Sequence, residues 1–168
     1  MSALTLALIT RTLQPLRGQA WHGGPTPVGA VRGVDAALAR WRPARGRHTI
    51  WELALHIAYW NYAVRRRLLR TPIPRFPRSP ANWPATPRPA DEAAWAADQA
   101  LLAREHRLLV EVVQDFPPAR LNRRAGTRKR WTYGDLVLGI TVHDAYHVGQ
   151  IQLLKRLALH RWRGVEAP

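Results

Sequence analysis

The stretch "TVHDAYHVGQIQLLKRL", residues 141–157, carries two histidines, His143 and His147, four positions apart. Apolar residues recur around them every three or four positions, which predicts a long helix with one core-facing stripe. The predicted stripe comprises Leu136, Ile140, His143, His147, Ile151, Leu154 and Ala158. Side chains four apart on a helix are neighbours, so both imidazoles can reach one cation at about 2.0–2.1 Å from each nitrogen. Spacing alone leaves two interpretations open: a metal site, or two packed core histidines.

A second predicted helix repeats this pattern. It begins at Thr49, where "TIWE" has the form of a capping box between Thr49 and Glu52, and it runs to about residue 69. Its inward stripe comprises Leu53, His56, Trp60 and Ala63 or Val64. If the two helices are neighbours, His56 supplies a third ligand. A three-histidine site leaves positions for water or substrate, as catalytic metal sites do.

The other histidines, and the pattern itself, have simpler interpretations. A lone buried histidine is usually satisfied by a hydrogen bond, and pairs four apart also occur by chance. Two buried imidazoles a few ångströms apart nevertheless need a partner, because neither takes up charge cheaply. His48 is interpreted as a loop residue at the helix start rather than a fourth ligand or a pocket wall. His22, His106 and His160 are interpreted as surface or packing residues.

The rest of the sequence predicts an all-α helical bundle that forms a single domain, residues 1–168. Further helical segments are expected at 3–17, 28–41, 90–116 and 133–159, the last capped by Thr132. Residues 71–90 hold seven of the fourteen prolines, so no helix passes through them. This segment also carries Ile73, Phe76 and Trp83, and we expect it to pack along the helices as a long ordered loop.

The composition limits the chemistry. The chain has no cysteine, which excludes disulfides, thiolate nucleophiles and cysteine-ligated zinc. Lysine and arginine number 26 against 11 acidic residues, giving a net charge of +15. Such a charge attracts nucleic acid, an acidic membrane surface or acidic small molecules, although a GC-rich coding bias also yields this arginine-, alanine- and proline-rich profile. No membrane-spanning run and no secretory signal are recognisable, so the expected location is the cytoplasm.

Two segments resemble the signature segments of the DinB-like family, which comprises damage-inducible, metal-binding four-helix bundles. They are "HTIWELALHIAYWNYAVRRRL" (48–68) and "HDAYHVGQIQLLKRL" (143–157). "WHGGPT" (21–26) and "FPRSPANWP" (76–84) are also similar to connecting segments of one DinB-like subgroup. The resemblance extends from about residue 20 to residue 158, and "HDAYHVGQI" is its most specific element.

The resemblance implies an up-down-down-up bundle that holds a divalent metal, often zinc or nickel, through three histidines. By motif position, these ligands would be His56, His143 and His147. Better-studied relatives are thiol-dependent transferases or isomerases that use bacillithiol, mycothiol or glutathione. The family name refers to gene induction, hence an association with stress response, and does not imply DNA binding.

The first functional hypothesis is a metal-dependent enzyme that transfers an exogenous low-molecular-weight thiol onto a small-molecule electrophile, with hydrolysis at the same metal as a variant. Four residues near the ligands are candidates for orienting them or a substrate: Asp144, Tyr146, Gln150 and Tyr59. Asp144 is expected to face solvent rather than to act as a general base. Because Asp144 rather than glutamate follows His143, the sequence does not indicate a zincin-type protease.

Two alternatives remain open. The basic stretch "RLNRRAGTRKRW" (120–131) would suit a nucleic-acid or polyanion-binding module, with Trp131 stacking on a base, although no recognisable nucleic-acid motif is present. A metal-stabilised bundle without turnover is the third hypothesis. Eight tryptophans also offer anchors for a homodimer.

Overall fold

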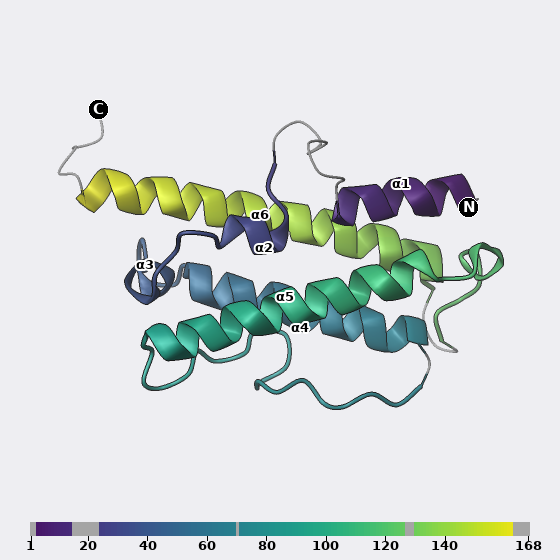
Figure 1. Cartoon of the computed structure of the whole chain (residues 1–168), viewed down its shortest axis with the longest axis horizontal. Helices are drawn as coiled ribbons and strands as arrows, with labels where there is room; N and C mark the ends of the chain where they lie inside the picture. Colours follow the sequence, from purple (N-terminus) through teal and green to yellow (C-terminus); the bar gives the residue numbers. More distant parts are fainter. Residues whose placement is uncertain (1–2, 15–23, 70, 127–129, 163–168) are drawn as a thin grey trace.

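The computed structural model describes residues 3–14, 24–69, 71–126 and 130–162. The elements are α1 (Ala3–Leu13), α2 (Pro27–Ala30), α3 (Ala36–Arg40), α4 (Ile50–Leu69), α5 (Glu92–Gln114), a 3₁₀ turn (Pro118–Arg120) and α6 (Tyr133–Trp162) (Figure 1). Within the described residues no strand forms, apart from one isolated bridge between Arg124 and Thr132. The predicted all-α class is confirmed.

The long helices lie side by side, and their contacts fix their relative directions. Trp51 packs on Trp95 near the start of both α4 and α5, so these two helices run in the same direction. The first half of α4 shares an apolar cluster with the second half of α6, and the second half of α4 shares another with the first half of α6, so α6 runs the opposite way. Figure 1 shows the same arrangement, with α1 and α6 running against α4 and α5.

Side-chain caps set the starts of the long helices. At α4, Thr49 Oγ1 accepts from the Glu52 amide (3.1 Å) and the Glu52 carboxylate accepts from the Thr49 amide (3.0 Å), which is the predicted capping box. Thr132 and Asp135 form the same reciprocal pair at α6, with N–O distances of 3.1 and 2.7 Å. Asp91 caps α5. Each cap satisfies amides that the first turn of a helix leaves without partners.

Two predicted helical segments differ from the structure. The segment expected at 28–41 is two short helices, α2 and α3, because Gly33 adopts a left-handed conformation (φ 70°) and Asp35 caps a new helix. The first helix ends at Leu13 rather than at residue 17. Residues 15–17 lie outside the described part of the chain.

The proline-rich segment runs back along the bundle, so that α5 begins at the same end as α4 (Figure 1). Phe76 and Trp83 are partly buried against the apolar core, as the sequence predicts. Arg78 forms an ion pair with the fully buried carboxylate of Asp98 (2.8 Å), which also accepts from Trp51 Nε1 (2.8 Å). Packing and an ion pair from the partly exposed Arg78 to a buried carboxylate therefore hold this loop against the helices.

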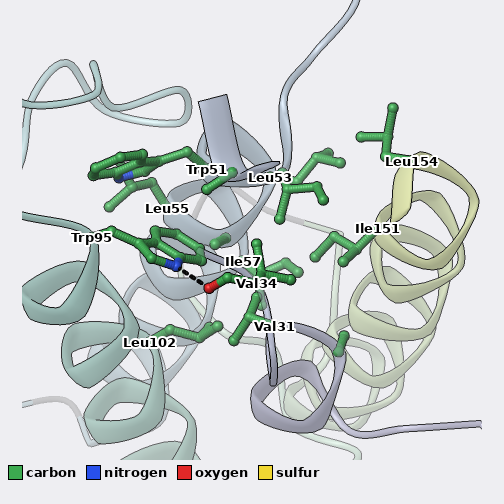
Figure 2. Close-up of a cluster of buried hydrophobic side chains, with 14 of the residues drawn as sticks. Val31, Val34, Trp51, Leu53, Leu55, Ile57, Trp95, Leu102, Ile151 and Leu154 are labelled. Atoms are coloured by element: carbon green, nitrogen blue, oxygen red, sulfur yellow. Dashed lines mark hydrogen bonds between the residues drawn. The ribbon is translucent and has the colours of Figure 1, made fainter. Parts of the chain in front are cut away.

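The core consists of two apolar clusters. The Trp51 cluster joins α2 and α3 to the first half of α4, the first half of α5 and the second half of α6; within it, Trp95 Nε1 donates to the Val34 carbonyl (2.6 Å) (Figure 2). The Leu109 cluster joins α1 to the other halves of the long helices. Between the clusters the three long helices carry a buried polar layer: Asn61, Glu105, His106, Thr141 and Asp144.

Among the described helices, none has a stretch both long and apolar enough to cross a membrane.

Candidate metal centre

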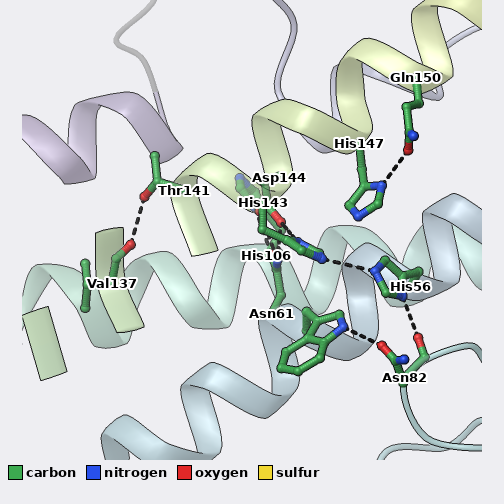
Figure 3. A network of polar contacts seen from close by, with 11 residues as sticks. His56, Asn61, Asn82, His106, Val137, Thr141, His143, Asp144, His147 and Gln150 are labelled. Atoms are coloured by element: carbon green, nitrogen blue, oxygen red, sulfur yellow. Dashed lines mark hydrogen bonds and ion pairs between the residues drawn. The ribbon is translucent and has the colours of Figure 1, made fainter. Parts of the chain in front are cut away.

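Three histidines meet where α4 faces α6. His56 comes from α4, and His143 and His147 come from successive turns of α6 (Figure 3). One ring nitrogen from each lies within 4.8 Å of the others. The Nε2 atoms of His56 and His143 are 3.1 Å apart, close to the roughly 3.3 Å expected between two ligands of a tetrahedral ion with bonds of 2.0–2.1 Å. The sequence-predicted triad is thus brought together and positioned to bind a metal ion.

The opposite ring nitrogens face oxygen acceptors. His56 Nδ1 donates to the Asn82 carbonyl (2.6 Å), and His147 Nδ1 donates to Gln150 Oε1 (2.7 Å). His143 Nδ1 lies 3.4 Å from Asp144 Oδ1, a longer contact of the same kind. A proton held on Nδ1 leaves the lone pair on Nε2, the atom that faces the centre of the triad. Such outer partners orient metal-binding histidines in proteins.

Electrostatics favour uncharged imidazoles here. Burial lowers the pKa of His56 from 6.5 to about 4, against the opposing effect of the Asn82 carbonyl. Burial likewise lowers the pKa of His147, with Gln150 acting in the opposite direction. The neighbouring imidazoles of His143 and His147 also lower the pKa of His56, and His143 lowers the pKa of His147. Neutral imidazole is the form that ligates metals, so His56 and His147 are ready to bind at neutral pH.

We expect the metal-free protein to lose stability as the pH falls from 6.5 towards 4. Between these values the unfolded chain protonates His56 and the folded chain does not, so the free energy of unfolding should fall by about 1.4 kcal/mol per pH unit for this residue. Urea unfolding at pH 7, 6 and 5 measures the slope. His56→Gln should reduce this slope by the contribution of one proton, about 1.4 kcal/mol per pH unit. An unchanged slope in this variant would show that His56 is not the group with the lowered pKa.

The polar layer corrects the prediction for Asp144 and shows that His106 is a packing residue. Asp144 is 3% exposed, so it does not face solvent as expected; both its oxygens accept from Asn61 Nδ2 (3.0 and 2.9 Å). His106 has partners: its Nδ1 lies 3.2 Å from Asn61 Oδ1 and 3.9 Å from the Asp144 carboxylate, and its Nε2 lies 3.2 Å from the Leu13 carbonyl. Burial lowers the pKa of His106, while Asp144 and Leu13 raise it. This layer connects α1, α4 and α5 to the helix that carries His143.

The proline-rich loop supplies a part of the site that the sequence did not predict. Trp83 stacks on His56, with ring centroids 3.8 Å apart and an interplanar angle of 14°. Asn82 gives its carbonyl to His56 and its side-chain oxygen to Trp60 Nε1 (2.8 Å), and it does so from a left-handed conformation (φ 72°). Asparagine tolerates this conformation better than most residues. The loop therefore holds His56 in place.

The other residues predicted to orient the ligands or a substrate lie at different distances from the triad. Gln150 contacts His147, and the Tyr146 hydroxyl accepts from Gln150 Nε2 (3.2 Å), although the Tyr146 side chain is largely exposed. The Tyr59 ring packs against Tyr62 and Phe76, on the side of α4 that faces the proline-rich loop.

The histidines outside the triad have other surroundings. His48 does not belong to the described group that could hold a metal ion, which is the triad. Its ring stacks on the other face of Trp83, with ring centroids 3.7 Å apart. His48 also lines a cavity. It is therefore a pocket wall, where a simple loop residue was expected. His160 is exposed at the end of α6, as expected. His22 lies outside the described residues.

Two cavities lie along α6, and only the first has a histidine of the triad in its wall. One, of about 570 Å³, has His143 and Trp60 in its wall and extends towards the start of α6. The other, of about 560 Å³, has His48 and Gln150 in its wall and extends towards the end of α6. Ligand-binding pockets typically occupy about 300–1,000 Å³. Both cavities are large enough for a small molecule that reaches the triad.

The basic stretch 120–131 is partly used in packing. The Arg120 guanidinium lies over the rings of Phe116 and Tyr133, at 5.0 and 5.1 Å from their centroids. Arg124 pairs with Thr132 through the isolated bridge. Trp131 is 58% exposed. Residues 127–129 lie outside the described part, so the proposed nucleic-acid surface is only partly visible.

A family model described as the DinB superfamily matches residues 28–151, a range that includes all three histidines of the triad. Neither the curated proteins nor the solved structures contain a match to this chain.

Proposed function

The chain belongs to the DinB superfamily, and from this premise we propose that it is an enzyme whose divalent metal is held by His56, His143 and His147. The proposed reaction transfers a low-molecular-weight thiol onto a small electrophile. The observation that carries the proposal is the convergence of one ring nitrogen from each histidine within 4.8 Å, while the Nδ1 atoms of His56 and His147 face oxygen acceptors. The two Nε2 atoms of His56 and His143, 3.1 Å apart, can share a single proton, but only a cation also engages the ring nitrogen of His147.

The donor set fits a catalytic rather than a purely structural metal. Three imidazoles leave at least one coordination position for an exchangeable ligand. A divalent metal bound there would favour the thiolate form of a bound thiol. Because the chain has no cysteine, that thiol has to come from outside. The cavity at His143 and the second cavity, which is lined by Gln150, the partner of His147, would provide room for two reactants, which a transferase needs.

The proposed step is a substitution. The thiol sulfur forms a bond to the electrophilic carbon, the bond from that carbon to its leaving group breaks, and the thiol proton is released to solvent. The chain's own residues fix the geometry: Asn82 and Gln150 hold the imidazoles, and Trp83 covers one face of His56. The loop and the apolar cavity wall would also limit access of water to the reacting carbon.

A thiol panel tests this function. Protein reconstituted with zinc or nickel is mixed with bacillithiol, mycothiol or glutathione and a chlorinated dinitrobenzene, and thioether formation is followed by absorbance. We expect at least one thiol to react on the order of 100-fold or more faster than without protein, the contribution typical of a single positioned catalytic group. Chelation should remove this activity and added metal should restore it. If every thiol reacts at the spontaneous rate with fully metal-loaded protein, thiol transfer is wrong and the metal-stabilised bundle without turnover is favoured.

Other features stay predictions of the sequence. They are zinc or nickel as the metal, a role in stress response, a cytoplasmic location and homodimerisation. The hypothesis of a polyanion-binding module makes a separate prediction, steeply salt-dependent DNA binding in a mobility-shift assay.

A further inference from the structure

The cavity of about 570 Å³ lies between the second half of α4 and the first half of α6. Its wall includes Trp60, Arg67, Arg130, Trp131, Gly139 and His143. His143 stands at one end, so a molecule bound in the cavity borders the proposed metal. Gly139 has nothing within 4 Å of the position where a Cβ would stand, which keeps this part of the groove open.

Most of the wall is apolar. Val64, Leu136 and Ile140 belong to the buried Leu109 cluster, and Trp60 packs against it. Trp131 is 58% exposed, which is unusual for so large an apolar side chain. Two indoles and a floor of aliphatic side chains suit a flat apolar or aromatic group, because stacking on rings and burial of apolar surface both favour it.

The charged groups in the wall are unbalanced. Neither Arg67 nor Arg130 forms an ion pair with any acidic residue in the described part of the chain. The Arg67 guanidinium instead lies 6.0 Å from the centroid of the Trp60 ring. The carboxylate in the wall, Asp135, already accepts from the amide and the hydroxyl of Thr132. The cavity wall therefore carries two guanidinium cations against one carboxylate, and neither cation is ion-paired to it within the described residues. Guanidinium groups bind carboxylates through paired hydrogen bonds.

We propose that this cavity binds an organic anion with an apolar or aromatic body, its carboxylate at Arg67 and Arg130 and its body between Trp60 and Trp131. If the proposed function holds, on which this assignment of a role rests, the anion is the electrophilic substrate and its reactive carbon lies beside His143. The second cavity, lined by His48 and Gln150, is then left for the thiol. Binding of the anion itself does not require the metal.

Calorimetric titration with naphthalene-2-carboxylate tests the proposal, at pH 7.5 and 150 mM salt. The neutral naphthalene-2-carboxamide has the same ring and nearly the same size. We expect saturable binding of one carboxylate per chain, in metal-free and in metal-loaded protein, and binding of the carboxamide about tenfold weaker or worse. Equal affinity for the two compounds would overturn the role of the arginines. An absence of saturable binding in both forms of the protein would overturn the proposal.

A matched pair of variants separates this site from the general attraction of a chain with charge +15. Arg67→Gln removes a cation from the cavity wall, whereas Arg66→Gln removes its exposed neighbour, which lies over the Tyr62 ring instead. We expect about tenfold weaker binding for Arg67→Gln and an unchanged affinity for Arg66→Gln. Equal losses in both variants would show non-specific attraction and would contradict the site.

Trp131→Ala gives an independent measure, since an exposed side chain can be removed with little effect on folding. This variant should bind naphthalene-2-carboxylate several-fold more weakly than the wild type does. An unchanged affinity would contradict the placement of the apolar body. The failures are distinguishable. Anion binding without any thiol turnover would refute the proposed reaction but leave the anion site supported. Thiol turnover without anion binding would support the reaction and refute the anion site.

Discussion

Replacing His143 by alanine should abolish stoichiometric metal binding. Wild-type protein purified without a histidine tag and exposed to zinc is expected to retain close to one equivalent after gel filtration, and the variant close to none. Tetrahedral zinc sites bind with about 10–16 kcal/mol, so one of their ligands is worth roughly 3 kcal/mol, or a factor of about 100–1,000 in affinity. The Nε2 atoms of His143 and His56 are 3.1 Å apart. Among the described residues, the group that could hold a metal ion contains only His56, His143 and His147, so it offers no substitute for His143.

His160→Ala is the matched control. His160 lies on the same helix and is exposed at its end, so its removal should leave the metal content unchanged. The thermal midpoint gives a second readout: the metal should stabilise the wild type and His160→Ala, and it should not stabilise His143→Ala, because only a ligand bound to the folded state raises stability. One retained equivalent in His143→Ala would refute the triad.

The helices and the inward-facing positions of the three histidines were predictable because both depend on local pattern. A stripe repeating every three or four residues shows which helix face is buried, and His56, His143 and His147 all lie on such stripes. Capping boxes at Thr49 and Thr132 fix helix starts through contacts between residues only three apart. These features need no knowledge of how distant segments meet.

The polar layer was not predictable from one stripe. Asp144 lies beside the stripe of α6 rather than on it, and a single stripe assigns such a residue to solvent. However, α6 packs against α4 and also against α1 and α2, so it buries a wider arc than one stripe, and that arc includes Thr141 and Asp144. One signal in the sequence could have indicated this layer. Asn61 and His106, like Asp144, are polar residues in the middle of long helices that are otherwise rich in apolar residues.

The loop's part in the site depends on tertiary structure alone. Asn82 is 26 residues from His56, and nothing in "SPANWP" indicates that its carbonyl would meet an imidazole. The sequence predicted that Trp83 would pack somewhere, because a large aromatic in a proline-rich segment needs a surface to cover. It did not indicate that this surface would be His56 on one side and His48 on the other.

Replacing Asp144 by alanine should lower both stability and metal affinity. Asn61 is fully buried, and the variant leaves its amide donor without the carboxylate that now accepts from it, at a cost of about 1–3 kcal/mol. His143 loses the oxygen that faces its Nδ1, and the loss of such an outer partner typically weakens metal binding 10–100-fold. A solvent-facing aspartate would change stability by no more than about 0.5 kcal/mol. Urea unfolding of metal-free protein and zinc titration measure the two effects separately.

Asp144→Asn separates the two roles of this carboxylate. Its amide oxygen can still accept from Asn61, so most of the stability should return, but a neutral oxygen holds the His143 Nδ1 proton less strongly, so metal binding should stay weakened by about tenfold. The exposed Asp115 offers the matched control for lost charge, and Asp115→Ala should change neither quantity. The two measurements are linked, because the extra destabilisation of metal-loaded over metal-free protein must equal the loss in metal affinity. If Asp144→Ala and Asp144→Asn bind zinc as tightly as the wild type, Asp144 supports only the core, and the orientation of His143 depends on packing alone.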